Sequence, residues 1–208
     1  MKTITASDIE GFEKRYRTSL INSLSGIRTA FIGITADDRD RYNAATLSNI
    51  THVGANPAQM SILFRPDNGK RHTLSNYRNQ GRISLVCMPF TKSATVHEVS
   101  MNAPEGIFEL EIVGESLKEH QDWTHPLPTA FLYAIELEFI EEFTLNNGCV
   151  YTVGRIQNIA LGDDIQVCEQ GRVLFKQSPT LAIGLQQYTG IASDNKHIPY
   201  PSTLKYGL

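Results

Sequence analysis

Two long strand-like runs joined by a strong turn signal limit what this chain can fold into. Residues 132–145 and 149–161 are rich in β-branched, aromatic and alternating apolar residues, and residues 146–148 between them read Asn-Asn-Gly. An Asn-Gly pair favours the tight turns that connect neighbouring antiparallel strands. The sequence therefore predicts a long antiparallel hairpin, followed by another turn at residues 162–164.

Shorter strands are expected in the first half of the chain. Runs rich in Ile, Val, Phe and Thr alternate with turn signals such as D-D-R-D, G-A-N-P and P-D-N-G, and they cover residues 29–35, 42–53, 58–64 and 82–88. Six or seven strands, mostly in hairpin order and with few helices, are typical of an antiparallel β-barrel. We therefore predict a mainly β fold, a β-barrel with added helices, and a single domain over residues 1–208.

Helices are expected at three places, and the tail is less regular. Ser7 and Glu10 form a capping-box pattern, after which apolar residues recur at helical spacing, so residues 8–25 are predicted to form an amphipathic helix. Thr73 stands where the N-cap of a second helix belongs, and residues 93–102 have weaker helical character. Residues 114–130 are predicted to form a surface loop, and the chain after residue 177 is predicted to cover the barrel or a partner subunit.

Composition excludes several classes of protein. Hydrophobic residues make up 41% and charged residues 20% of the chain, as in ordinary globular proteins. The pI of about 6.1 argues against nucleic acid as the main partner. Neither a long apolar run nor a secretory signal is visible, so we expect a cytoplasmic protein without membrane contact.

The cysteines, histidines and paired acids show no metal or acid–base pattern. The three cysteines are widely spaced and lack a C-x-x-C motif, and the histidines lack a ligand spacing, so we expect no metal site. We interpret the histidines as surface or hydrogen-bonded residues. Glu136 and Glu138 alternate with apolar neighbours, so we place them on the outward face of a strand rather than in an acid–base pair.

A basic segment between residues 65 and 82 indicates an anionic ligand. It sets five basic residues against one acid, Asp67, in a chain of net charge −3, and these basic residues are Arg65, Lys70, Arg71, Arg78 and Arg82. The start of a helix offers free backbone N–H groups and the positive end of a dipole, which together with basic side chains suit a phosphate group. The alternative is a basic surface that faces only water.

The segment immediately upstream points to a planar ligand. Residues 42–50 read Y-N-A-A-T-L-S-N-I, in which small and hydroxylated residues replace the bulky ones that a core strand would carry. Small residues allow a flat ring to approach the backbone, and Asn43, Thr46 and Ser48 offer hydrogen bonds. The alternative is an edge strand whose polar face is solvated.

The order of these features resembles a known family. The sequence N-A-A-T-L-S-N-I-T-H-V-G-A-N-P, then R-P at the end of a strand, then R-H-T-x-x-N, is similar to the flavin reductase-like family of FMN-binding split barrels. The resemblance implies that residues of the small strand lie beside the isoalloxazine and ribityl chain of FMN, and that residues of the basic corner hold its phosphate. It assigns Asn43, Thr46, Leu47 and Ser48 to the first group and Arg65, Arg71, His72 and Thr73 to the second, with Ala94 and Ser100 matched by looser spacing.

The resemblance also implies a function. It predicts an FMN-containing NAD(P)H:flavin oxidoreductase that transfers hydride from a nicotinamide to flavin, acts as a homodimer, and supplies a second flavin or a partner oxygenase. No catalytic residue is identified, and the absence of G-x-G-x-x-G means that a nicotinamide must bind without a Rossmann unit. Two alternatives remain open: an FMN electron carrier that another protein reduces, and a split barrel that holds a different phosphorylated cofactor such as pyridoxal phosphate.

Overall fold

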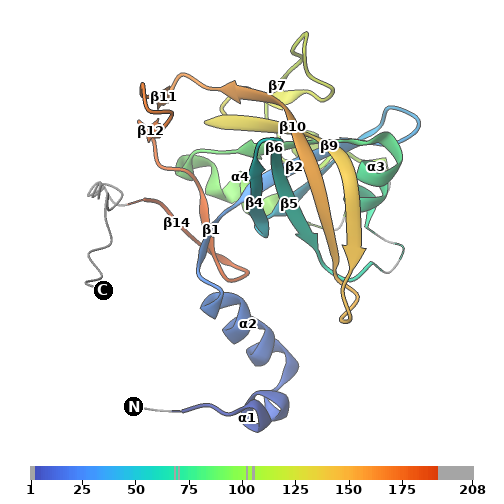
Figure 1. The fold of residues 1–208 in the computed structure, drawn as a ribbon, viewed down its shortest axis with the longest axis vertical. Coiled ribbons are helices and arrows are strands. Elements are labelled where there is room, and N and C mark those ends of the chain that lie inside the picture. Colours follow the sequence, from blue (N-terminus) through green and yellow to red (C-terminus); the bar gives the residue numbers. More distant parts are fainter. Residues whose placement is uncertain (1–2, 68, 70, 102, 105, 192–208) are drawn as a thin grey trace, which may run out of the picture.

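A curled antiparallel sheet of seven strands forms the body of the protein (Figure 1). The computed structural model describes residues 3–67, 69, 71–101, 103–104 and 106–191. In sheet order the strands are β3 (Tyr42–Leu47), β2 (Phe31–Ala36), β6 (Arg82–Cys87), β9 (Tyr133–Thr144), β10 (Val150–Leu161), β5 (Ala58–Phe64) and β4 (Ile50–Ala55). The predicted mainly β, antiparallel fold is confirmed, and β9 with β10 forms the predicted long hairpin.

The two edge strands of this sheet are consecutive in the sequence. We predicted one strand over residues 42–53, which is wrong at its centre, because the chain leaves β3 at Ser48 and Asn49 before it enters β4. The Asn49 carbonyl instead accepts a hydrogen bond of 2.9 Å from the Leu63 N–H group. The break turns the chain from one edge of the sheet to the other, as a barrel requires, and it leaves the outer edge of β3 without a partner strand.

Short strands cover the ends of the main sheet. Three small sheets pair β1 (Ile27–Thr29) and β14 (Gln187–Thr189) with β13 (Leu181–Ile183), β11 (Ile165–Val167) with β12 (Val173–Phe175), and β7 (Leu117–Lys118) with β8 (Leu127–Pro128). The predicted surface loop at 114–130 is thus interrupted by one two-stranded pairing. The predicted covering tail begins with β13 and β14, and its last part, residues 192–208, lies outside the described residues.

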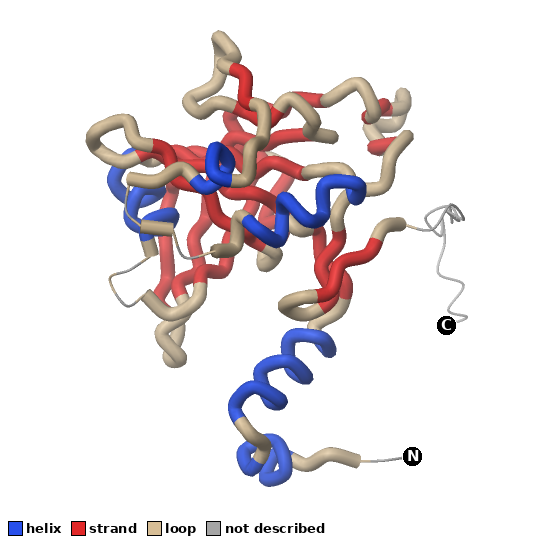
Figure 2. The backbone as a smooth tube through the Cα atoms, turned by 180° about the vertical axis from the view of Figure 1, so that it is seen from behind, coloured by secondary structure: helices blue, strands red, loops and turns tan. Residues whose placement is uncertain are grey.

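The predicted N-terminal helix is two helices, which extend away from the sheet (Figure 2). α1 (Ala6–Gly11) begins with a capping box formed by Thr5 and Asp8, not by Ser7 and Glu10. The chain then bends at Phe12, and the Glu13 side chain accepts hydrogen bonds from the N–H groups that start α2 (Lys14–Leu24). A second capping residue inside the predicted helix explains why it divides.

The remaining helices pack on the sheet. They are α3 (His72–Gln80), the 3₁₀ turn η1 (Phe90–Lys92), α4 (Ser93–Glu98) and α5 (Glu109–Ile112). α3 is fixed by Tyr77, which is fully buried and meets Phe139 of β9 edge to face, with ring centroids 5.2 Å apart. The Tyr77 hydroxyl lies where a side chain at residue 154 would begin, so Gly154 of β10 permits this packing. The start of α3 is thereby held at a set position beside β3.

Two apolar clusters on either side of the sheet form the core. Several polar side chains are buried with them, including His125 and Glu136. The prediction that Glu136 faces outward is therefore wrong, because its carboxylate accepts hydrogen bonds of 2.9 Å from the Thr124 N–H group and from Asn158. These partners satisfy the charge, so an acid on a strand can point inward.

Candidate functional site

A groove of about 930 Å³ follows the free edge of β3 and ends at the start of α3. This volume lies at the upper end of the range that cofactor pockets usually have. Nine of the ten predicted ligand-binding residues line it, and they are Asn43, Thr46, Leu47, Ser48, Arg65, Arg71, His72, Thr73 and Ser100. The tenth, Ala94, lies on the exposed surface of α4 and is not part of the groove lining.

The wall that β3 contributes is narrow and carries small side chains. Ala45 leaves the backbone open to the groove, whereas Ala44 is 1% exposed and packs into the core; Leu47 and Ser48 line the groove at the end of the strand. The hydroxyl of Thr46 donates to the Val96 carbonyl of α4, so it ties two walls together. This edge can receive a flat ring beside Ala45, because no neighbouring strand in the described part of the chain pairs with it.

Glu109 also lines the groove, although the sequence patterns did not identify it as a site residue. It is 5% exposed and accepts a hydrogen bond of 2.7 Å from the Ala44 N–H group, so α5 occupies one position on the free edge of β3. Burial raises the pKa of Glu109, and the Ala44 N–H group partly opposes that rise. Alternation of acidic and apolar residues at 108–113 was the available signal, and it did not show which acid faces inward.

The groove ends at the start of α3, next to the first residues of β3. Arg71 is the N-cap, and no side chain caps the free N–H groups of the first turn. The prediction that Thr73 is the N-cap is therefore wrong by two residues. Thr73 instead accepts a hydrogen bond of 2.8 Å from the Asn43 amide, which joins β3 to α3. An uncapped helix start of this kind suits an anion.

The basic residues of this segment divide into paired and unpaired groups. Arg78 forms ion pairs of 2.6 Å with Asp67 and 2.7 Å with Glu142, and Arg82 lies 3.5 Å from Glu138. Arg65 and Arg71, both in the groove lining, have no acidic partner within ion-pair distance among the described residues. Lys70 lies outside those residues. These two guanidinium groups, of which that of Arg71 donates to the Pro66 carbonyl at 3.5 Å, therefore lack an acidic partner in the described part of the chain and line the groove that ends at the open helix start.

Metal and membrane features are not found in the part of the chain that is described. Within it, His, Cys, Asp and Glu residues nowhere gather in threes in a way that would hold a metal ion. Its three cysteines are free thiols, and Cys87 is buried. None of its helices combines the length and apolar content that crossing a bilayer requires.

Comparison with known proteins identifies the family. The model of the flavin reductase-like domain matches residues 25–175. The chain belongs to this family. The predicted resemblance is thereby confirmed, although no curated protein matches the sequence significantly.

Solved structures of split-barrel proteins share the whole fold of this flavin reductase-like chain. One, from Shewanella frigidimarina NCIMB 400, is described as a flavin reductase with a split barrel domain; it is 24% identical, with a TM-score of 0.88 over 97% of this chain and 100% of its own. Nitrilotriacetate monooxygenase component B from Bacillus cereus is 17% identical, with a TM-score of 0.78 over 95% and 98% of the two chains. An FMN-binding protein from Thermus thermophilus is 19% identical, with a TM-score of 0.69 over 83% and 91%.

The groove fits the cofactor that this family membership supports, which is FMN. The ring requires a flat, open wall, and the free edge of β3 at Ala45 meets that requirement. The phosphate carries close to two negative charges and requires donors, which Arg65, Arg71 and the first turn of α3 supply. Both requirements are met within one cavity, by the edge of β3 and by the adjoining start of α3.

Proposed function

We propose that this protein is an FMN-dependent NAD(P)H:flavin oxidoreductase. The observation that carries the proposal is the groove itself, in which an open strand edge with small residues faces two unpaired arginines at an uncapped helix start. When bound, FMN accepts a hydride from a nicotinamide and passes the electrons to an acceptor.

Each wall of the groove has a separate task in this proposal. Arg65, Arg71, His72 and Thr73 hold the phosphate through charge-assisted hydrogen bonds and free N–H groups. Asn43 keeps the two walls in register through its hydrogen bond to Thr73. The protein thus fixes the position of the ring, and positioning is its main contribution to a reaction in which the cofactor carries the hydride.

The edge of β3 determines how closely the ring approaches the protein. Ala44 is held by Glu109, whose carboxylate accepts its N–H group, so the strand edge stays in place without a neighbouring strand. Thr46 is fixed through its hydroxyl to α4, and Leu47 and Ser48 complete the wall. We propose Ser100 as a contact from the segment after α4. Ala94, predicted as a cofactor contact, does not line the groove and is not part of the proposal.

The acceptor of the electrons is a second flavin or a partner oxygenase. The names of two structural neighbours, from Bacillus cereus and Mycobacterium thermoresistibile, describe component B of nitrilotriacetate monooxygenase, which supports an oxygenase as partner. We further propose that the chain is a single domain of a cytoplasmic protein.

A homodimer is part of the proposal. Apolar side chains of α2 are exposed, with Tyr16 at 56%, Ile21 at 45% and Leu24 at 73%, and Figure 1 shows the helix projecting from the body. A second subunit would cover them. Light scattering at micromolar concentration should report twice the mass of the 23.2 kDa chain, and a monomer would refute this part.

Anaerobic stopped-flow mixing tests the reductase activity. The FMN-loaded protein is mixed with NADH or NADPH while the flavin absorbance is followed, and rapid bleaching by one nucleotide is expected. Bleaching by dithionite but by neither nucleotide would contradict the reductase and support the electron carrier. A purified protein that takes up pyridoxal phosphate but not FMN would refute both.

A further inference from the structure

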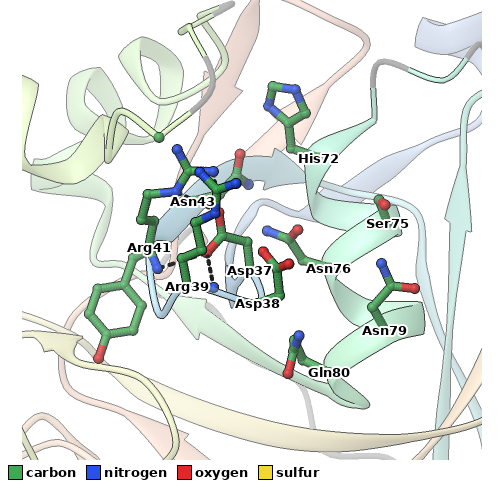
Figure 3. A pocket seen from close by; sticks show the side chains of 12 residues that line it. Asp37, Asp38, Arg39, Arg41, Asn43, His72, Ser75, Asn76, Asn79 and Gln80 are labelled. Carbon is green, nitrogen blue, oxygen red and sulfur yellow. Dashed lines mark hydrogen bonds and ion pairs between the residues drawn. The ribbon is translucent and has the colours of Figure 1, made fainter.

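A second cavity lies beside the groove, on the far side of the start of α3. Its volume is about 400 Å³, within the usual range for ligand pockets. Asn43 and His72 line both cavities, so the two meet at the end where we place the phosphate of FMN. Figure 3 shows the second cavity between the turn that joins β2 to β3 and one side of α3.

The α3 wall of this cavity is made of neutral hydrogen-bonding side chains. Ser75, Asn76, Asn79 and Gln80 line it, and Figure 3 shows them along one side of the helix. Asn76 donates to the Thr35 hydroxyl at 3.3 Å, whereas Ser75, Asn79 and Gln80 make no side-chain hydrogen bond within the described residues. Amides and hydroxyls both donate and accept, which matches the edge of a purine and the hydroxyls of a ribose.

The facing wall is a charged turn with a rigid base. Asp37 forms an ion pair of 2.6 Å with Arg41 and accepts hydrogen bonds from the backbone N–H groups of Arg39 and Arg41. The hydrogen bond from the Arg41 N–H group is the largest cause that lowers the pKa of Asp37 to about 2. The side chains of Asp38 and Arg39 have no ion-pair partner among the described residues. The two acids and two arginines balance in formal charge. Such a cavity suits a neutral nucleoside with a phosphate at its mouth better than a free polyanion.

We propose that the second cavity binds the adenosine monophosphate half of a dinucleotide. The inference rests on the proposed placement of the FMN phosphate at Arg71, His72 and Thr73. Since His72 lines both cavities, a group attached to that phosphate can pass directly from the groove into the second cavity. In FAD the adenylate is joined to that phosphate. The nicotinamide cosubstrate carries the same adenylate without this link, and the experiment separates the two.

The test blocks the second cavity without changing the groove. Asn79 is exposed, lies on α3 about two turns after the phosphate end, and lines only the second cavity, so Asn79→Tyr should fill it. Gln166→Tyr places the same ring on an exposed position of β11, which lines neither cavity, and serves as the control. Calorimetry with the apoprotein measures the binding of FMN, FAD and 5′-AMP, and calorimetry with the FMN-loaded protein measures ADP-ribose.

The parent protein should bind FAD at least as tightly as FMN. Asn79→Tyr should weaken FAD about tenfold or more while FMN stays within about twofold, and Gln166→Tyr should change neither. If FAD is unaffected and ADP-ribose is weakened instead, the adenylate belongs to the nicotinamide cosubstrate. Equal affinities of parent and Asn79→Tyr for FAD, ADP-ribose and 5′-AMP would overturn the proposal.

The proposed function can fail separately. If the parent does not bind FMN, the proposed function is wrong, whereas binding of 5′-AMP that Asn79→Tyr abolishes would still support a nucleotide site in the second cavity. If Asn79→Tyr weakens FMN as much as FAD, the variant has disturbed the groove, and the assignment of the adenylate to a separate cavity is refuted.

Discussion

Acidification should destabilise this protein through one buried histidine. His125 is 1% exposed, its Nδ1 atom lies 2.9 Å from the Ser84 hydroxyl, and its ring meets that of Tyr42 edge to face at 6.3 Å. Burial lowers its pKa to about 4, although the negative charge of Glu136 acts in the opposite direction. The folded protein therefore keeps His125 neutral at pH values where the unfolded chain binds a proton.

The size of the effect follows from the two pKa values. In the unfolded chain the pKa is close to 6.5, so the unfolded state takes up the proton first as the pH falls. Keeping His125 neutral therefore costs the folded state no stability above pH 6.5, and the free energy of unfolding falls progressively from there towards pH 4. Proton linkage gives a loss of about 2 kcal/mol between pH 7 and pH 5. For a chain of this length that loss lowers the melting temperature by about 4–8 °C.

Thermal unfolding of the parent and of His125→Gln at pH 7 and pH 5 measures this effect. Glutamine keeps an amide that can bond to Ser84 but does not titrate, so the variant should lack the extra decrease at pH 5 whatever its stability at pH 7. Equal decreases in parent and variant would refute the reasoning. The interpretation of the histidines as hydrogen-bonded residues is confirmed for His125.

Three further predictions concern the groove. Arg71→Ala should weaken FMN by about 1.5–3 kcal/mol, or roughly tenfold to a hundredfold, while riboflavin binding stays unchanged, and fluorescence titration of both ligands measures this. Ala45→Phe should prevent FMN uptake by narrowing the groove, whereas Ala55→Phe on the exposed end of β4 should not; comparable flavin content in the two purified variants would count against the ring site. Glu109→Gln should retain the Ala44 contact and remove a buried charge. Burial raises the pKa of Glu109, so ionisation destabilises the folded parent but not the variant. The variant's free energy of unfolding in urea, relative to that of the parent, should therefore increase as the pH rises above about 4.5. A difference that stays constant between about pH 4 and pH 8 would contradict burial as the cause of the raised pKa.

The sequence predicted the parts of the fold that depend on neighbouring residues. The β9–β10 hairpin follows from alternation and an Asn-Gly turn, both of which are local signals. The start of α3 was misplaced because Thr73 has a better contact elsewhere, the Asn43 amide of β3, which lies 30 residues earlier. Glu136 was misplaced for the same reason, since Asn158, a partner that permits its burial, comes from another strand. Tertiary partners of this kind have no signature in local spacing.

Because distant partners leave no local signal, counting the basic residues of 65–82 overestimates the positive charge available to an anion. Arg78 and Arg82 add to the positive charge of residues 65–82 in the sequence, yet their partners Glu142 and Glu138 lie on β9, more than fifty residues later. Because opposite charges this close largely cancel at a distance, neither arginine contributes much to the field in the groove. We expect the attraction for a phosphate to come instead from Arg65, Arg71 and the uncapped first turn of α3. It follows that Arg78→Ala, unlike Arg71→Ala, should leave the preference for FMN over riboflavin unchanged, although both residues belong to one basic segment.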